Sequence, residues 1–330
     1  MGIALLGISS MIITSCNMKV EPDRSTGRTN EILVVTNSKV QWEGGLGYII
    51  RNVFQQPLPG LPQPEPMFHL LNVADKDFNK VFKAQHNIFI VDINSSFTEP
   101  LVEKLSNVWT RPQRVIKITA PDTASFRKVF EEHSAAFLKA YDELEIERTN
   151  EQLKMARSVT LRNIVEKQFG FSMQLQGGFA VAASDNNFLW LRQKVQKVKQ
   201  DIEMGIIIHE QPYIDTNAFS PQNILILRDS LTSKFIPGPS PGSFMVLSKG
   251  FVEPVFTRVD DFVTGFAVET RGLWMVHNDF MGGPFISYTF VDPELNSVIT
   301  VDGYVYNPSD LKRNLIRQLE AIFHTITFDY

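Results

Sequence analysis

The order of strand and helix signals along the chain constrains its fold more than any other feature. From residue 31 to about residue 120, short β-branched runs alternate with stretches of helical period. Parallel strands need long crossover connections, so this alternation predicts βα units with at least partly parallel pairing. The expected strands are 32–36, 68–73, 87–93 and 114–119, and the expected helices are 45–54, 75–82 and 99–108.

The pattern changes after a long helix. Pro121-Asp122-Thr123 supplies a start signal, and apolar residues recur near helical period to about Met155. Beyond residue 157, short strands follow one another and predict an antiparallel meander, with turns at Gly282-Gly283-Pro284 and Asp292-Pro293. Separate strands are expected at 265–270 and 273–280. Helices are expected at 161–169 and 220–235, and a final helix is expected to open at Asn307-Pro308-Ser309-Asp310.

The resulting fold class is α+β. We expect an α/β-like N-terminal half with a mixed sheet, residues 31–157, and a mainly antiparallel C-terminal half with flanking helices, residues 158–330. The chain has 330 residues and a formal net charge of −4, so it lacks the basic footprint that nucleic acid demands. No stretch after residue 16 approaches the roughly 18 unbroken apolar residues that span a bilayer.

The N-terminus indicates export. Residues 2–13 form an uncharged apolar stretch of signal-peptide length, which runs into Ile13-Thr14-Ser15-Cys16. This ending resembles the lipobox of bacterial lipoproteins, in which small residues give the signal peptidase access to the bond before a lipidated cysteine. Cys16 is the only cysteine, so the body carries no thiol in an oxidising compartment. The lack of Lys or Arg before the apolar stretch departs from the usual pattern.

We therefore predict a signal peptide at 1–15, lipidation at Cys16, and a polar tether at 16–30. The lipid on Cys16 would anchor the protein to a membrane, which is therefore an expected binding partner. Asn17 stands where an aspartate retains many lipoproteins at the inner membrane, so the outer membrane is favoured and the leaflet is left open.

Several segments together resemble an uncharacterised Bacteroidota lipoprotein family, the domain of unknown function 4837. The resemblance covers nearly the whole mature chain and implies export and one shared architecture, but no agreed activity and no catalytic residue. The segments are 60–66 (GLPQPEP), 188–192 (FLWLR), 234–239 (KFIPGP), 271–274 (RGLW) and 279–285 (DFMGGPF).

Motifs that suggest catalysis or cofactors fail on physical grounds. Gly238-Pro239-Ser240-Pro241-Gly242 matches the nucleophile elbow, but Pro241 has no N–H for the oxyanion hole. The segment 75–86 begins like a calcium loop but lacks its glycine and its final glutamate. Gly44-Gly45-Leu46-Gly47 lacks the third glycine of the dinucleotide fingerprint. No two of the six histidines have the spacing of a zinc helix. We expect no cofactor, no metal site and no catalytic set.

Three segments remain as candidate binding surfaces. Arg192, Lys194, Lys197 and Lys199 form a basic cluster that is either a solvated face or a site for anionic groups. The prolines between 57 and 66 form either a packed connector or a docking surface. The aromatic residues around the Met-Gly-Gly-Pro turn fill a core or bind a glycan or protein partner; those named as a possible surface are Trp274, Phe280, Phe285 and Tyr288.

The leading functional hypothesis is a non-enzymatic envelope protein that binds a protein or glycan partner. The alternative is an envelope hydrolase whose site assembles from distant His and Asp or Glu residues, for instance around His209-Glu210 or His277-Asn278-Asp279. A third hypothesis is a periplasmic carrier of a small apolar ligand, which would need a large apolar cavity.

Overall fold

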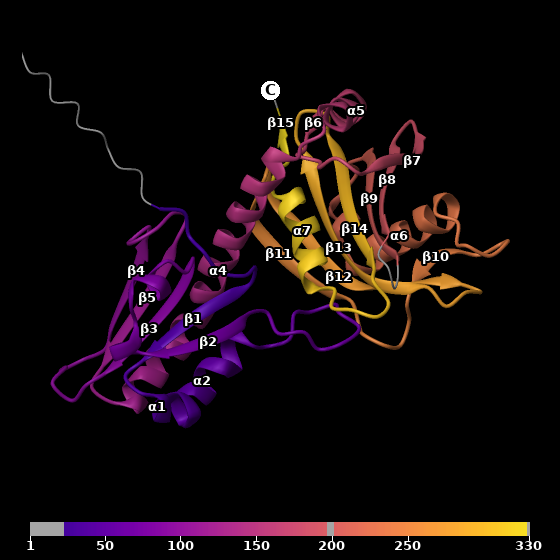
Figure 1. Cartoon of the computed structure of the whole chain (residues 1–330). Helices are drawn as coiled ribbons and strands as arrows, with labels where there is room; N and C mark the ends of the chain where they lie inside the picture. Colours follow the sequence, from indigo (N-terminus) through magenta and orange to yellow (C-terminus); the bar gives the residue numbers. More distant parts are fainter. Residues whose placement is uncertain (1–22, 197–200, 329–330) are drawn as a thin grey trace, which may run out of the picture.

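The computed structural model describes residues 23–196 and 201–328, and its first part is built on a five-stranded mixed sheet (Figure 1). The strand order is β2-β1-β3-β5-β4, in which β4 alone runs antiparallel to its neighbour. This confirms the predicted mixed sheet. The strands are β1 (Glu31–Thr36), β2 (His69–Ala74), β3 (Asn87–Ile93), β4 (Leu101–Ser106) and β5 (Arg114–Ala120).

Helices cover this sheet because its central strands are apolar on both faces. One face packs against α2 (Gly45–Phe54), which follows α1 (Lys39–Glu43), and against the first half of α4 (Thr123–Met155). Phe54 lies at the centre of that layer, in edge-to-face contact with Phe89, Phe130 and Tyr141. The other face carries a smaller core beneath η1 (Asp75–Asp77) and α3 (Lys80–Lys83).

The helix predicted at 99–108 is wrong. Residues 101–106 form the edge strand β4, which pairs with β5 from Leu101↔Thr119 to Ser106↔Arg114. Most of its residues are exposed, so the apolar pattern along the sequence was weak. The hydrogen bonds offered by the edge of β5 decided the conformation, and such tertiary pairing overrides local propensity.

The second part is an eight-stranded antiparallel sheet in the order β10-β12-β13-β14-β9-β8-β7, with β11 beside β12. The predicted antiparallel half is thus confirmed. Its strands are β7 (Ala180–Asp185), β8 (Phe188–Gln196), β9 (Asp201–Pro212), β10 (Phe244–Leu247), β11 (Val255–Phe262), β12 (Gly265–His277), β13 (Gly282–Asp292) and β14 (Ser297–Tyr306). A further two-stranded sheet pairs β6 (Phe171–Ser172) with β15 (Thr327–Phe328).

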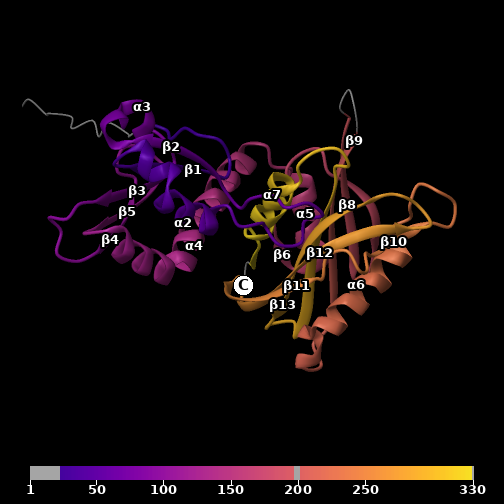
Figure 2. The same cartoon turned by 90° about the horizontal axis from the view of Figure 1, so that it is seen from below.

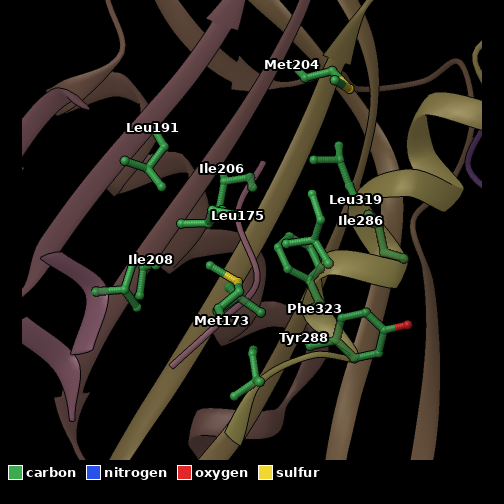
Figure 3. Close-up of a cluster of buried hydrophobic side chains, with 14 of the residues drawn as sticks. Met173, Leu175, Leu191, Met204, Ile206, Ile208, Ile286, Tyr288, Leu319 and Phe323 are labelled. Atoms are coloured by element: carbon green, nitrogen blue, oxygen red, sulfur yellow. The ribbon is translucent and has the colours of Figure 1, made fainter. Parts of the chain in front are cut away.

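Helices lie on both faces of the large sheet (Figure 2). On one face α5 (Val159–Phe169) and α7 (Arg313–Phe323) cover the largest core, where Ile206, Ile286 and Tyr288 meet Leu319 and Phe323 (Figure 3). The opposite face, to which the edge strand β10 contributes Met245 and Leu247, packs against α6 (Pro221–Phe235), which follows η2 (Thr216–Phe219). None of the helices within the described residues is long and apolar enough to cross a membrane.

Three predicted details of this half are wrong. Residues 265–277 form one strand instead of two. The turn lies at 278–281, where Asn278 adopts a φ of 61°, and Gly282 and Gly283 belong to β13. A Cβ on Gly283 would lie 2.0 Å from the carbonyl oxygen of Val305, so this glycine serves close strand packing and not a turn. The last helix begins at Arg313, after an N-cap at Lys312.

The proline-rich segment is a connector packed on the body. It leaves α2, crosses to the second part and returns to β2 (Figure 1). Leu58 and Leu61 are buried in the core of the large sheet. The buried carboxylate of Glu65 accepts hydrogen bonds from the backbone N–H groups of Lys312 (2.8 Å) and Arg313 (2.9 Å). These are orphan donors at the start of α7, so the segment caps that helix from a distance.

Candidate functional site

The four aromatic residues singled out from the sequence do not form one surface. Phe285 and Tyr288 lie three positions apart on β13, so they face opposite sides of the sheet. Tyr288 is buried under α7, where its hydroxyl donates to Glu269 (2.7 Å). Phe285 and Trp274 are buried in the core on the α6 face. Only Phe280, in the turn between β12 and β13, is fully exposed.

Trp274 nevertheless contributes to a hollow at one end of the α6 face. The hollow has a volume of about 420 Å³, within the roughly 300–1,000 Å³ of typical ligand pockets. Its aromatic lining comes from Trp190, Trp274, Tyr304 and Tyr306, on three different strands. The remaining walls are formed by Ile236, Pro237, Gly238, Pro239, Met245, Val276 and Met281, together with the charged residues Arg192, Lys194, Asp201 and Glu203.

Strand geometry explains why these side chains converge. Trp190, Arg192 and Lys194 alternate along β8, so all three point to the same face of the sheet. Tyr304 lies directly opposite Gly205 of β9. A Cβ on Gly205 would approach the Tyr304 ring to 2.0 Å, so the absence of a side chain there makes room for the ring.

A chain of hydrogen bonds fixes the floor of the hollow. Trp190 Nε1 donates to the hydroxyl of Tyr304 (3.1 Å), which donates to Glu203 (2.9 Å). Arg192 Nη2 donates to the other oxygen of Glu203 (2.6 Å). Trp274 Nε1 donates to the carbonyl of Val305 (3.3 Å), and its ring meets Tyr304 edge to face at 5.3 Å. The aromatic groups are therefore held in place before any ligand arrives.

The electrostatics of the hollow are balanced. Burial disfavours the Arg192 cation, but its hydrogen bond and attraction to Glu203 outweigh that cost and raise its pKa. Burial, reinforced by the charge of Glu203, raises the pKa of the Tyr304 hydroxyl well above 10. Lys194 and Asp201 add one further charge of each sign. Two cations thus face two anions, and the lining carries no net formal charge.

The hollow contains members of two groups predicted from the sequence, the aromatic residues near the Met-Gly-Gly-Pro turn and the basic cluster. Arg192 and Lys194 belong to the predicted basic cluster, while Lys197 and Lys199 lie outside the described residues. In the hollow, Asp201 and Glu203 balance the charges of Arg192 and Lys194. Sequence reasoning missed Trp190, Glu203 and Tyr304 as site residues. The alternation in the segment FLWLR, which places Trp190 and Arg192 on one face, was the available signal.

The two histidines named for the hydrolase hypothesis, His209 and His277, lie in different surroundings. His209 Nδ1 lies 2.9 Å from the carbonyl of Asn187, and burial lowers its pKa. It shares with Asp302 a space of only about 20 Å³, room for roughly one water molecule. His277 stacks on Phe244 at 5.0 Å. Among residues 23–196 and 201–328, no group of three His, Cys, Asp or Glu side chains is placed to hold a metal ion.

Carboxylates do gather in a second hollow of about 250 Å³ between α4 and α7. Asp142 accepts from Arg317 (2.5 Å), and burial raises the pKa of its carboxyl group. Glu320 accepts from Arg271 (2.7 Å). Both carboxylates are ion-paired: Asp142–Arg317 joins the two parts of the chain, whereas Glu320–Arg271 holds α7 on β12 within the second part.

The second part of the chain matches a family model over residues 158–325, just over half of the sequence. That model is described as a domain of unknown function, DUF4837. The chain belongs to the DUF4837 family. The resemblance had been expected to cover nearly the whole mature chain, but residues 25–154 match a different model, the domain of unknown function DUF8532.

No curated protein matches this DUF4837 member. Among solved structures, it is similar to the Ran-binding protein Mog1p of Saccharomyces cerevisiae, at 8% identity and a TM-score of 0.31. The match covers 48% of this chain and 90% of the yeast protein. A likeness at this level supports no conclusion about fold or function.

Proposed function

We propose that this DUF4837 protein is an exported lipoprotein, anchored through lipid on Cys16, that binds a neutral glycan in the hollow lined by Trp190, Trp274, Tyr304 and Tyr306. The anchor rests on the sequence, because the lipobox-like ending and the single cysteine coincide at one residue. Cys16 lies outside the described residues.

The observation that carries the glycan proposal is the combination of aromatic lining and balanced charge. The C–H face of a sugar ring packs against aromatic side chains, while its hydroxyls donate to carboxylates and accept from Arg and Lys. A strongly anionic ligand would meet Asp201 and Glu203, and a cationic ligand would meet Arg192 and Lys194. An uncharged ligand rich in hydroxyls therefore fits best. The charged walls also make a purely apolar ligand a poor fit.

Binding is tested by titrating the purified protein with neutral oligosaccharides of glucose and of N-acetylglucosamine. Trp190 and Trp274 lie in the hollow, so we expect the intrinsic tryptophan fluorescence to change in a saturable way. Tyr306→Ala removes a partly exposed wall of the hollow and should weaken binding at least tenfold. Tyr48→Ala, which alters an exposed tyrosine of α2 in the other part, should leave binding unchanged.

Two results would overturn the glycan proposal. One is the absence of a saturable response to any neutral oligosaccharide. The other is binding that Tyr306→Ala and Tyr48→Ala weaken equally, since that would place the ligand outside the hollow.

The anchor is tested separately by mass spectrometry of the mature N-terminus. A peptide that begins at Cys16 and carries a diacylglyceryl group is expected, and Cys16→Ser should release the protein from the membrane fraction. An unmodified Cys16 in the membrane-extracted protein would refute the anchor. We further propose that the protein is a Bacteroidota lipoprotein of the outer membrane, in line with Asn17 after the cysteine.

A further inference from the structure

We infer that the surface formed by residues 23–28, 80–85 and 107–113 lies against a phospholipid bilayer with anionic headgroups. The inference about this anchor-proximal surface rests on the proposed lipid anchor, but different observations support it. They are the place where the described chain joins the fold, the charge of these segments, and the apolar side chains that they expose.

The first observation is the place where the chain joins the fold. Asp23 accepts a hydrogen bond from the N–H of Arg111 (3.0 Å), and Ser25 donates to the carbonyl of Arg111 (2.9 Å). Six residues separate Asp23 from Cys16, and the seven Cα-to-Cα steps between them span at most about 25 Å. A lipid on Cys16 would therefore hold the membrane within that distance of Asp23.

The second observation is that the three segments form one continuous surface. Thr26 donates to the carbonyl of Ala84 (2.8 Å). The side-chain amide of Gln113 donates to the carbonyls of Lys83 and Gln85, both at 2.7 Å. Lys83 Nζ lies 5.5 Å from the centre of the Trp109 ring. The segment next to the anchor is thus bonded directly to α3 and to the loop between β4 and β5.

The third observation is the charge of this surface. Its three segments contain five cations and one acid, whereas the whole chain has a net charge of −4. A basic patch on an acidic protein is suited to anionic headgroups, which attract Lys and Arg near the membrane surface. The cations are Arg24, Arg28, Lys80, Lys83 and Arg111, and the acid is Asp23.

The fourth observation is the exposure of apolar groups among these cations. Val81 is 76% exposed and Val108 is 42% exposed. Trp109 is half-buried beside them, and tryptophan is a residue favoured at membrane interfaces. β10, whose Met245 helps to line the aromatic hollow, is well separated from β4 and β5 of the first part in Figure 1.

The test uses the full mature lipoprotein reconstituted in vesicles of phosphatidylglycerol and phosphatidylethanolamine. Lipidation occupies the thiol of Cys16, so an introduced cysteine is the only reactive one. A polarity-sensitive fluorophore is attached at Val81→Cys or Val108→Cys. The matched control is Val40→Cys, which is 79% exposed on α1, beyond the opposite end of β1.

We expect fluorophores at 81 and 108 to shift to shorter wavelength on vesicles and to be quenched by spin-labelled lipid, while the fluorophore at 40 is unaffected. Arg111→Glu should at least halve the quenching at 81, whereas Arg127→Glu, an equal charge change on the exposed side of α4, should not. Spin-labelled lipid should quench the fluorophores at 81 and 108 less on vesicles of phosphatidylcholine alone than on the anionic vesicles.

The two proposals fail in different ways. If the wild-type chain does not float with vesicles, both the anchor and the surface inference are refuted. If it floats but fluorophores at 81 and 108 are no better protected than the fluorophore at 40, the anchor stands and the surface inference is overturned. Equal quenching on anionic and neutral vesicles would refute the role of the cations.

Discussion

Replacing Tyr304 by phenylalanine should destabilise the second part of the chain by a predictable amount. The substitution removes one oxygen and leaves the ring in place, so packing is preserved. Two hydrogen bonds disappear, the one donated by Trp190 Nε1 (3.1 Å) and the one donated to Glu203 (2.9 Å). Trp190 is buried, so its N–H loses its acceptor without access to bulk water.

The size of the effect follows from these two losses. An unsatisfied buried donor costs about 1–3 kcal/mol, and a hydrogen bond to a charged group is worth about 1.5–3 kcal/mol. Glu203 keeps its hydrogen bond from Arg192, so the two losses do not add in full. We expect a fall of about 2–4 kcal/mol in the free energy of unfolding. With a urea m-value of about 2 kcal/mol/M, the midpoint should fall by roughly 1–2 M.

The assay is urea unfolding followed by tryptophan fluorescence, with Tyr306→Phe as the matched control. Tyr306 lies two residues along the same strand and on the same face, but it is only partly buried. We expect the control to change the midpoint by less than about 0.3 M, as is usual for substitutions outside buried networks. Equal, small shifts for the two variants would show that the chain from Trp190 to Glu203 does not stabilise the hollow.

Three further substitutions test other parts of the fold. Gly205→Ala should reduce the yield of folded protein or lower its stability by about 1–3 kcal/mol, measured by urea unfolding, because the new Cβ overlaps the Tyr304 ring. Phe54→Ala should cost about 3–5 kcal/mol in the first part, since Phe54 is fully buried among aromatic rings; a loss under 1 kcal/mol would contradict the packing described. Glu145→Gln should flatten the acid limb of a stability–pH profile. Burial alone would raise the pKa of Glu145, but the hydrogen bond with His86 and nearby positive charge lower it below 4.5. Its stabilising contribution is therefore present above pH 4.5 and lost as the pH falls through the lower folded-state pKa. Parallel profiles for wild type and Glu145→Gln between pH 3 and 6 would contradict this.

Much of the fold was encoded locally. The predicted helix 45–54 and strand 87–93 match α2 and β3 residue for residue, and α4 ends at the predicted Met155. Each of these elements has a strong hydrophobic period or a helix-capping residue. Asp122 is such a cap, and its side chain accepts a hydrogen bond from the N–H of Ser125 (2.8 Å) at the start of α4. Two of the mispredicted elements had their conformation set by distant partners: β5 for β4, and Glu65 for the start of α7.

The candidate site shows the same division. The sequence by itself indicated Cys16 as the residue to be lipidated, and it identified Trp274 and Arg192 as members of an aromatic and a basic group. It could not place them together, because Trp190, Glu203, Trp274 and Tyr304 come from four strands whose pairing spans more than a hundred residues. Alternation along a strand fixes which side chains share a face, but only the order and register of the strands decide which faces meet. The hollow is therefore a property of the tertiary structure.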